Sequence, residues 1–294
     1  MILALIALEQ QLRRMYLVNQ DFDIRPSASI EIRSSRPREY GTKLSLEDVI
    51  TLIEANGGPE GLDLSGRDLS GLDFSREAIQ SHIVSRQMET SFRHLPWVTY
   101  YNRGFNLKGV NLVKANLFAI NLAFVDLKNA NLEQAFLQAG ILTQARLQSA
   151  NFRNADLSQC HLGNSNANQA NFDEADLALC DLTGADFEDA SLRGASLHKA
   201  RLSGTRLNRR SLGDAIIQEN PHVLQRFLER HYPSLGQLRT SEWVQNRHLD
   251  DAQQIYASLK NNFLSIGNFE DASWAHIKQR QIMKMTHHPI DITR

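Results

Sequence analysis

The stretch ANFRNADLSQ at residues 150–159 consists of two five-residue blocks of the same kind. Each block opens with alanine, continues with a carboxamide or carboxylate residue, and has a large apolar residue at its centre. The same register runs through twenty-two consecutive blocks, whose centres fall at every fifth position from Leu107 to Leu212. Eighteen centres are leucine, three are phenylalanine and one is alanine.

A period of five fits neither regular secondary structure. On an α-helix, five steps of about 100° leave successive leucines roughly 140° apart, so that they would cover every face. On a β-strand, an odd spacing alternates between the two faces. The chain must therefore turn a corner once per block, which returns the same side chains to a common interior.

The blocks ANLEQ at 130–134, ADLSQ at 155–159 and ADFED at 185–189 resemble the pentapeptide-repeat family. The resemblance implies a mainly β solenoid, a right-handed quadrilateral β-helix with four blocks per coil. It also implies that the central residue and the small residue two positions before it point inward. The recurrent Asn or Asp before the centre suits corners, where a short polar side chain can bond the nearby backbone.

A coil of 20 residues would stack Phe152 on Phe172 and would bring Cys160 close to Cys180. At the inter-strand spacing of about 4.8 Å, a disulfide between these cysteines is geometrically conceivable. Two buried thiols in alanine-sized positions are the favoured interpretation, because free cysteine behaves as a small apolar residue.

The sequence pattern divides the chain into five segments. They are an amphipathic helix with a linker at 1–43, a capping helix with a first coil at 44–80, an aromatic and basic insert at 81–104, the main repeat at 105–217, and an α-helical region at 218–294. In the second segment, Ser45 and Asp48 form an expected helix N-cap pair. The helix that follows should cover the first coil, which would otherwise expose unpaired backbone edges.

The α-helical region at 218–294 resembles a single tetratricopeptide-repeat hairpin. The residues that carry the resemblance are Tyr256, Leu259, Phe263 and Ala272, with Gly267 and Asn268 as the turn. Two interpretations stay open for this hairpin, a cap of the solenoid alone or a cap that also binds a partner. Similar tails in some pentapeptide-repeat proteins lead into membrane segments, which would here lie downstream of Arg294.

Composition excludes several classes of function. The chain holds 32 Lys and Arg against 33 Asp and Glu, so that no strong net field attracts nucleic acid or anionic lipid. No apolar run reaches the roughly 18 residues of a membrane span, and two cysteines fit a reducing, cytoplasmic compartment. We find no catalytic, cofactor-binding or metal-binding motif, and a filled coil offers no substrate cleft. We therefore expect a protein that is not an enzyme and needs no cofactor.

Candidate binding residues are large apolar groups at outward positions near the N-terminal coils. They are Val113, Phe118, Phe124, Phe136 and Ile141, together with Trp97 and Tyr100 of the insert. One interpretation is that the N-terminal helix or the insert packs on this patch, and the other is that a partner protein binds there. Trp97 and Tyr100 lie among arginines and could stack on nucleic acid bases, although a loop laid over the coil is the favoured interpretation.

The leading hypothesis for function is a protein-binding scaffold, and a homodimer is compatible with it. The first alternative is DNA-mimicking inhibition of a type II topoisomerase, which the family resemblance allows. It would depend on the acidic run at 173–189, although the basic run at 193–210 balances this charge. The second alternative is membrane association through the tail or the N-terminal helix.

Overall fold

The computed structural model describes residues 41–56, 62–74, 78, 106–213, 215–219, 221–231 and 242–287. The chain forms two compact units, Met1–Glu39 and Tyr40–Arg294, and every described residue belongs to the second. The amphipathic helix expected near the N-terminus and the insert at 81–104, with Trp97 and Tyr100, lie outside the described residues.

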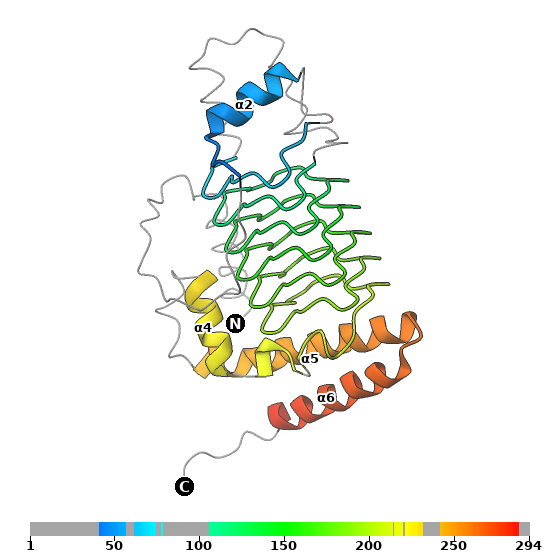
Figure 1. Cartoon of the computed structure of the whole chain (residues 1–294). Coiled ribbons are helices and arrows are strands. Elements are labelled where there is room, and N and C mark those ends of the chain that lie inside the picture. The colour runs from blue at the N-terminus through cyan, green and yellow to red at the C-terminus, as the bar shows by residue number, and fades with distance from the viewer. Residues whose placement is uncertain are drawn as a thin grey trace. The chain divides into compact units, whose positions relative to one another are not determined.

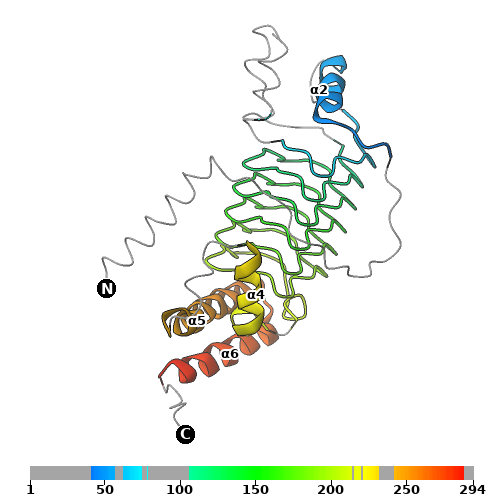
Figure 2. The same cartoon turned by 90° about the vertical axis from the view of Figure 1, so that its left-hand side faces the viewer.

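The repeat winds into stacked coils, which Figures 1 and 2 show. Successive coils are joined by parallel bridges between residues 20 positions apart, on four sides that we name A to D. The first bridges of the main run are Asn106 to Asp126 on side A, Asn111 to Asn131 on side B, Asn116 to Phe136 on side C, and Asn121 to Ile141 on side D. Each side contributes one bridged residue, so the described ladder consists of isolated bridges and contains no extended strand.

The interior of the coils holds the central residue of every block. From Leu107 to Leu212, no central residue is more than 6% exposed. The rings of Phe152 and Phe172 stack with their centroids 4.8 Å apart and their planes within 4°, which confirms the expected pairing of residues 20 positions apart. Burial of each leucine contributes about 1.5–3 kcal/mol, so the axial ladder is the main source of stability.

Cys160 and Cys180 occupy small-residue positions on side D, and both are free and buried. Each Sγ donates to a carbonyl of the preceding coil at 2.9 Å, that of Leu137 for Cys160 and that of Leu157 for Cys180. Burial raises the pKa of both thiols, so they stay protonated. The prediction of two buried thiols is confirmed.

The corners combine a left-handed backbone with a side-chain hydrogen bond. The second residue after the centre has a φ of 53–69° in all twenty blocks centred from Leu107 to Leu202, and sixteen of these residues are not glycine. In thirteen blocks, the Asn or Asp before the centre accepts a bond from the backbone N–H after the centre. The expected role of Asn and Asp at the corners is therefore confirmed. These bonds hold the chain in a conformation that L-residues rarely adopt.

The first coil precedes the insert yet stacks in register on the main run. Its bridges join Asp63 to Asn106, Asp68 to Asn111, and Asp73 to Asn116, an offset of 43 residues in place of 20. The described part of the first coil therefore continues the ladder of the main run on sides A, B and C.

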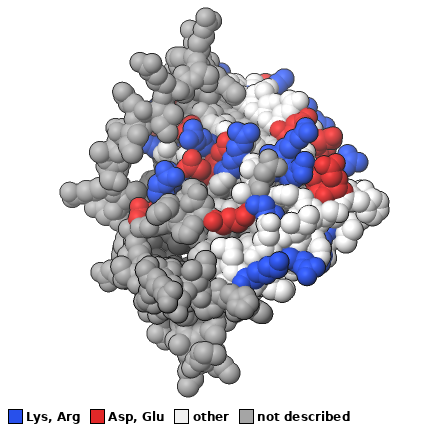
Figure 3. Space-filling model, turned by 90° about the horizontal axis from the view of Figure 1, so that it is seen from below, with Lys and Arg blue, Asp and Glu red and all other residues white. Residues whose placement is uncertain are grey.

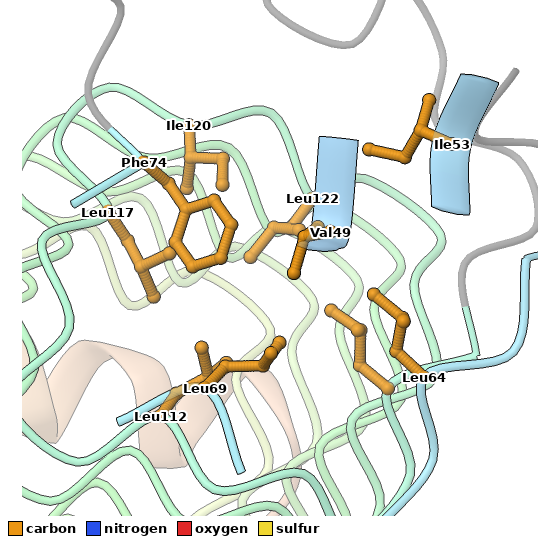
Figure 4. A pocket seen from close by; sticks show the side chains of 10 residues that line it. Val49, Ile53, Leu64, Leu69, Phe74, Leu112, Leu117, Ile120 and Leu122 are labelled. Atoms are coloured by element: carbon orange, nitrogen blue, oxygen red, sulfur yellow. The ribbon is translucent and has the colours of Figure 1, made fainter. Parts of the chain in front are cut away.

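Helix α2, Leu46–Ala55, begins at the expected N-cap. The Ser45 backbone N–H donates to Asp48 Oδ2 at 2.8 Å, and the Asp48 N–H donates to Ser45 Oγ at 3.1 Å. Val49 and Ile53 are each 2% exposed and line an apolar cavity of about 40 Å³ above the first coils, shown in Figure 4. The helix thus covers the open end of the interior.

The C-terminal part is helical. It contains the short 3-10 helix η2, Ile217–Glu219, and the helices α4, Pro221–His231, α5, Glu242–Ser265, and α6, Phe269–His287. Helices α5 and α6 form a hairpin that turns at Gly267, with a φ of 77°. The residues that resemble a tetratricopeptide repeat are buried at 0–3% exposure, namely Tyr256, Leu259, Phe263 and Ala272.

Helix α5 closes part of the last coil through side chains that replace the backbone of a further coil. Asn262 Oδ1 accepts from the Thr205 N–H at 3.1 Å, and Asn262 Nδ2 donates to the Thr205 carbonyl at 2.8 Å. At the start of α6, Asp271 Oδ2 accepts from the Arg209 N–H at 3.0 Å. The bonds to the Thr205 carbonyl and the Arg209 N–H satisfy edge groups on side A that no further coil can reach.

Candidate protein-docking face

Each side of a coil presents two outward positions, one before and one after the central residue. The position before the centre usually holds Asn or Asp, which turns its side-chain oxygen back to the corner. Phe136 and Ile141 stand at this position on sides C and D and cannot make that bond. Large apolar side chains therefore face outward at these two places.

Phe118 and Phe136 form an exposed aromatic pair on side C. The Phe118 N–H donates to Asn116 Oδ1 at 3.2 Å, and Asn116 bridges to Phe136, which brings the two rings together. Their centroids are 5.9 Å apart with planes 13° from parallel, and the residues are 40% and 37% exposed. We name these two residues the aromatic pair.

The other candidate residues lie on other parts of the coil. Val113 lies on side B, Ile141 on side D, and Phe124 at the corner after side D with a φ of 65°; all three are half-buried. Trp97 and Tyr100 are outside the described residues. Of the seven candidate residues, the structure brings the aromatic pair into direct ring contact.

The exposed part of side C is short. Below Phe118, the same outward position holds Gln138, Ser158 and Ala178, which are 9%, 1% and 8% exposed. The aromatic pair therefore lies where side C is open to solvent, and the position after the centre is buried in the three coils below Phe118.

Helix α4 lies against the stack closer to the C-terminus. A His231 ring nitrogen lies 3.2 Å from the Glu174 carbonyl oxygen, and Arg230 bonds the Glu174 carboxylate and Asn154 Oδ1. Burial lowers the pKa of His231, which opposes its charging. Partial burial alone would raise the pKa of Glu174, but the bond to Arg230 and the charges of Arg230 and Arg153 more than offset it and lower that pKa.

The acidic run at 173–189 is paired with arginines of the next coil. Arg201 lies 3.2 Å from Asp181, and Arg206 lies 3.9 Å from Asp186, in each case one coil later on the same side. Figure 3 shows acidic and basic side chains intermixed over the described surface seen from below. The two charged runs therefore partly neutralise each other in space.

Within the described ranges, no three His, Cys, Asp or Glu side chains gather closely enough to hold a metal ion. None of the described helices has the length and apolar character needed to cross a bilayer.

Sequence reasoning missed two features of this surface, the left-handed corners and the docking of α4. The glycines at some corners were a signal for the first feature, because glycine adopts a positive φ readily.

Comparison with known families identifies the coil. Residues 103–138, 120–159 and 170–209 match the family of pentapeptide repeats, with eight copies. The stack is a pentapeptide-repeat solenoid. The family implies a right-handed winding of the pentapeptide-repeat stack. No curated relative matches the chain in sequence.

Three solved structures are similar to part of this chain. The first is a trypsin-treated variant of QnrB1, a plasmid-mediated fluoroquinolone resistance protein, at 24% identity and a TM-score of 0.33 over 51% of this chain and 59% of that chain. HetL, involved in heterocyst differentiation regulation in the cyanobacterium Nostoc sp. Strain PCC 7120, is 25% identical with a TM-score of 0.25 over 55% and 70%. Rfr23 from the cyanobacterium Cyanothece 51142 is 25% identical with a TM-score of 0.30 over 56% and 100%. The chain thus spans less than two thirds of the length of that QnrB1 chain.

Proposed function

We propose that the pentapeptide-repeat stack is a non-catalytic scaffold that binds another protein through the aromatic pair, Phe118 and Phe136. The observation that carries the proposal is the contact of two exposed rings at 5.9 Å on a side where the position after the centre is buried in the three coils below Phe118. Large aromatic side chains dominate the energy of protein interfaces when a partner removes them from water.

The stack would supply a rigid platform for such binding. Each corner residue from Gly109 to Gly184 donates its backbone N–H to a carbonyl of the next coil, so the two rings keep their spacing without a partner. A preorganised surface loses little conformational entropy when it binds. We propose that Trp97 and Tyr100 of the insert extend the same surface, and that the protein acts in the cytoplasm, where its two buried thiols stay reduced.

The test is capture of partners by the full chain from an extract of its source cells, followed by reconstitution of each binding pair from purified proteins. The double variant Phe118→Asp with Phe136→Asp should weaken partner binding at least about tenfold, since each charge opposes burial of the ring surface. The matched control is Leu179→Asp, because Leu179 is also exposed, at 48%, but lies two coils beyond Phe136. Full retention of every partner by a folded double variant would remove the aromatic pair from the proposal.

Two alternatives, a homodimer and a topoisomerase inhibitor, are distinguished from the scaffold by separate measurements. If the rings pair two copies of this chain, sedimentation of the unmodified protein shows a dimer that the double variant loses.

Pairing of Asp181 and Asp186 with arginines counts against DNA mimicry, which needs a continuous acidic surface. Inhibition of gyrase supercoiling by the purified chain would favour the topoisomerase inhibitor over the protein-binding scaffold.

A further inference from the structure

Each coil exposes the same three backbone groups per side to the coil that follows. On side D, the Arg201 N–H donates to the Cys180 carbonyl at 2.8 Å, and the Leu182 N–H donates to the Arg201 carbonyl at 2.9 Å. The Gly184 N–H donates to the Ser203 carbonyl at 2.9 Å. Any strand added after a coil must therefore donate to one carbonyl and accept from two N–H groups on that side.

In the last coil, the equivalent groups on side D are the Ala200 carbonyl and the N–H groups of Leu202 and Gly204. None of the three has a hydrogen-bond partner in the part of the chain that the structure describes. Side A differs, because Asn262 and Asp271 bond its edge. Side chains of α5 and α6 thus bond two of the three edge groups on side A, whereas no described group bonds the three on side D.

A groove of about 350 Å³ lies at this open edge, between the last coil and α5. Its volume falls in the range of ligand-binding clefts, roughly 300–1,000 Å³. The residues that line it are Ala200, Arg201, Leu202 and Ser203 of the coil, and Ser258, Asn261, Asn262 and Ser265 of α5. The lining therefore combines backbone groups, hydroxyls and amides with one cation and no acid.

We propose that this groove binds an extended peptide segment of a partner protein, which adds to side D as one further strand. One peptide N–H would donate to the Ala200 carbonyl, and two peptide carbonyls would accept from Leu202 and Gly204. Unpaired sheet edges recruit peptides in this way, with backbone bonds giving affinity and side chains giving specificity.

The groove also indicates the side chains of the peptide. The residue below Arg201 should carry a carboxylate, because Arg201 already pairs upward with Asp181 at 3.2 Å and its side chain is 72% exposed. A third charged residue of opposite sign would extend that cross-strand ladder. The α5 wall of the groove is lined by Ser258, Asn261, Asn262 and Ser265, so the next residue should be small and able to form hydrogen bonds.

The probe is the peptide acetyl-alanyl-aspartyl-seryl-asparaginyl-alanine amide, added to the isotope-labelled full chain in an NMR titration. We expect saturable shifts of the Leu202 and Gly204 amides with a Kd of about 1 mM or tighter. The matched peptide carries an N-methyl group on its aspartyl nitrogen, which removes the bond to Ala200 and leaves the charge. It should bind at least about fivefold more weakly, since one backbone hydrogen bond contributes about 1 kcal/mol.

Two pairs of variants locate the site. Ser258→Phe should fill the groove and abolish the shifts, while Gln254→Phe, at another exposed position of α5, should not. Arg201→Ala should weaken binding of the peptide a few-fold, while Arg206→Ala on side A should leave peptide binding unchanged. These residues are distant in sequence from the aromatic pair and its test does not use them, so each proposal can fail alone.

Several outcomes would overturn strand addition. They are no shifts at about 5 mM peptide, equal binding of the N-methylated peptide, and equal loss in both members of a variant pair. A concentration-dependent dimer that Ser258→Phe abolishes would assign the groove to a second copy of this chain instead.

Discussion

At the N-terminal end of the stack, α2 lays Val49 and Ile53 over the apolar opening of the first coils, whereas at the C-terminal end Asn262 and Asp271 bond the backbone of the last coil. The first end is closed by burial of apolar area and leaves a small cavity. The second is closed in part by directional bonds, which hold two of the three edge groups on side A and none of the described ones on side D. A solenoid can thus cover its apolar interior with a helix at one end and bond its exposed backbone groups with helix side chains at the other.

The largest expected effect tests the apolar end. Val49→Asp places a charge in the cavity under α2, where no described cation can pair with it, and should lower the free energy of unfolding by about 3–4 kcal/mol. Urea unfolding followed by circular dichroism measures the change. The matched control is Leu52→Asp on the exposed face of α2, which should cost no more than about 0.5 kcal/mol. Equal losses in the two variants would show that α2 does not seal the stack.

A smaller effect is expected at the polar end. Asn262→Leu keeps the side-chain size but leaves the Thr205 carbonyl without its donor in a buried site, which should cost about 2 kcal/mol. Asn261→Leu is the control, because Asn261 is exposed on the same helix turn. Asn262→Asp keeps the acceptor for the Thr205 N–H and loses the donor, so it separates the two bonds. If Asn262→Leu unfolds at the same urea concentration as the unmodified chain, the cap contributes no stability.

The smallest effect is a pH dependence confined to α4. Burial holds the pKa of His231 below its ordinary value of 6.5, so the unfolded segment binds a proton more readily than the docked one. The docking of α4 should therefore weaken as the pH falls through and below about 6.5, while α2 stays unchanged. The charged groups that act on His231 are Asp156, Glu174 and Arg230. Because the pKa of Glu174 is lowered from 4.5, its contribution is lost only at more acidic pH.

Amide hydrogen exchange at about pH 7 and pH 5.5 measures this dependence, with α2 as the internal reference. The variant His231→Gln keeps an N–H donor near the Glu174 carbonyl and cannot titrate. After correction for intrinsic rates, the amides of its α4 should therefore exchange equally fast at both pH values. Unchanged protection of α4 in the unmodified chain would show that protonation of His231 does not weaken its docking.

Much of the fold could be predicted because its signal repeats. The five-residue period identified every central residue of the interior, and the thirteen Asn and Asp side chains made the expected corner bonds. The N-cap at Ser45 and the buried hairpin positions Tyr256 and Phe263 were also predicted correctly. In each case a local pattern of a few residues carries the information.

The corners and the candidate sites were harder to predict. Lys114, Glu174 and Leu179 have no local preference for a positive φ, and they adopt it because the coil-to-coil bonds require it. Sequence reasoning grouped Phe118 with other outward apolar residues, but its contact with Phe136 depends on a coil of 20 residues. The open edge at Leu202 could not be seen, because it depends on how α5 crosses the last coil.

The sequence by itself determined the interior of this protein, because a strict spacing of leucines allows only a backbone that turns every five residues. Tertiary structure alone decided which outward groups meet, which backbone edges are closed and where a groove opens. Those features depend on residues far apart in the chain, such as Thr205 and Asn262, whose bonds form only when a complete coil and a helix are packed together.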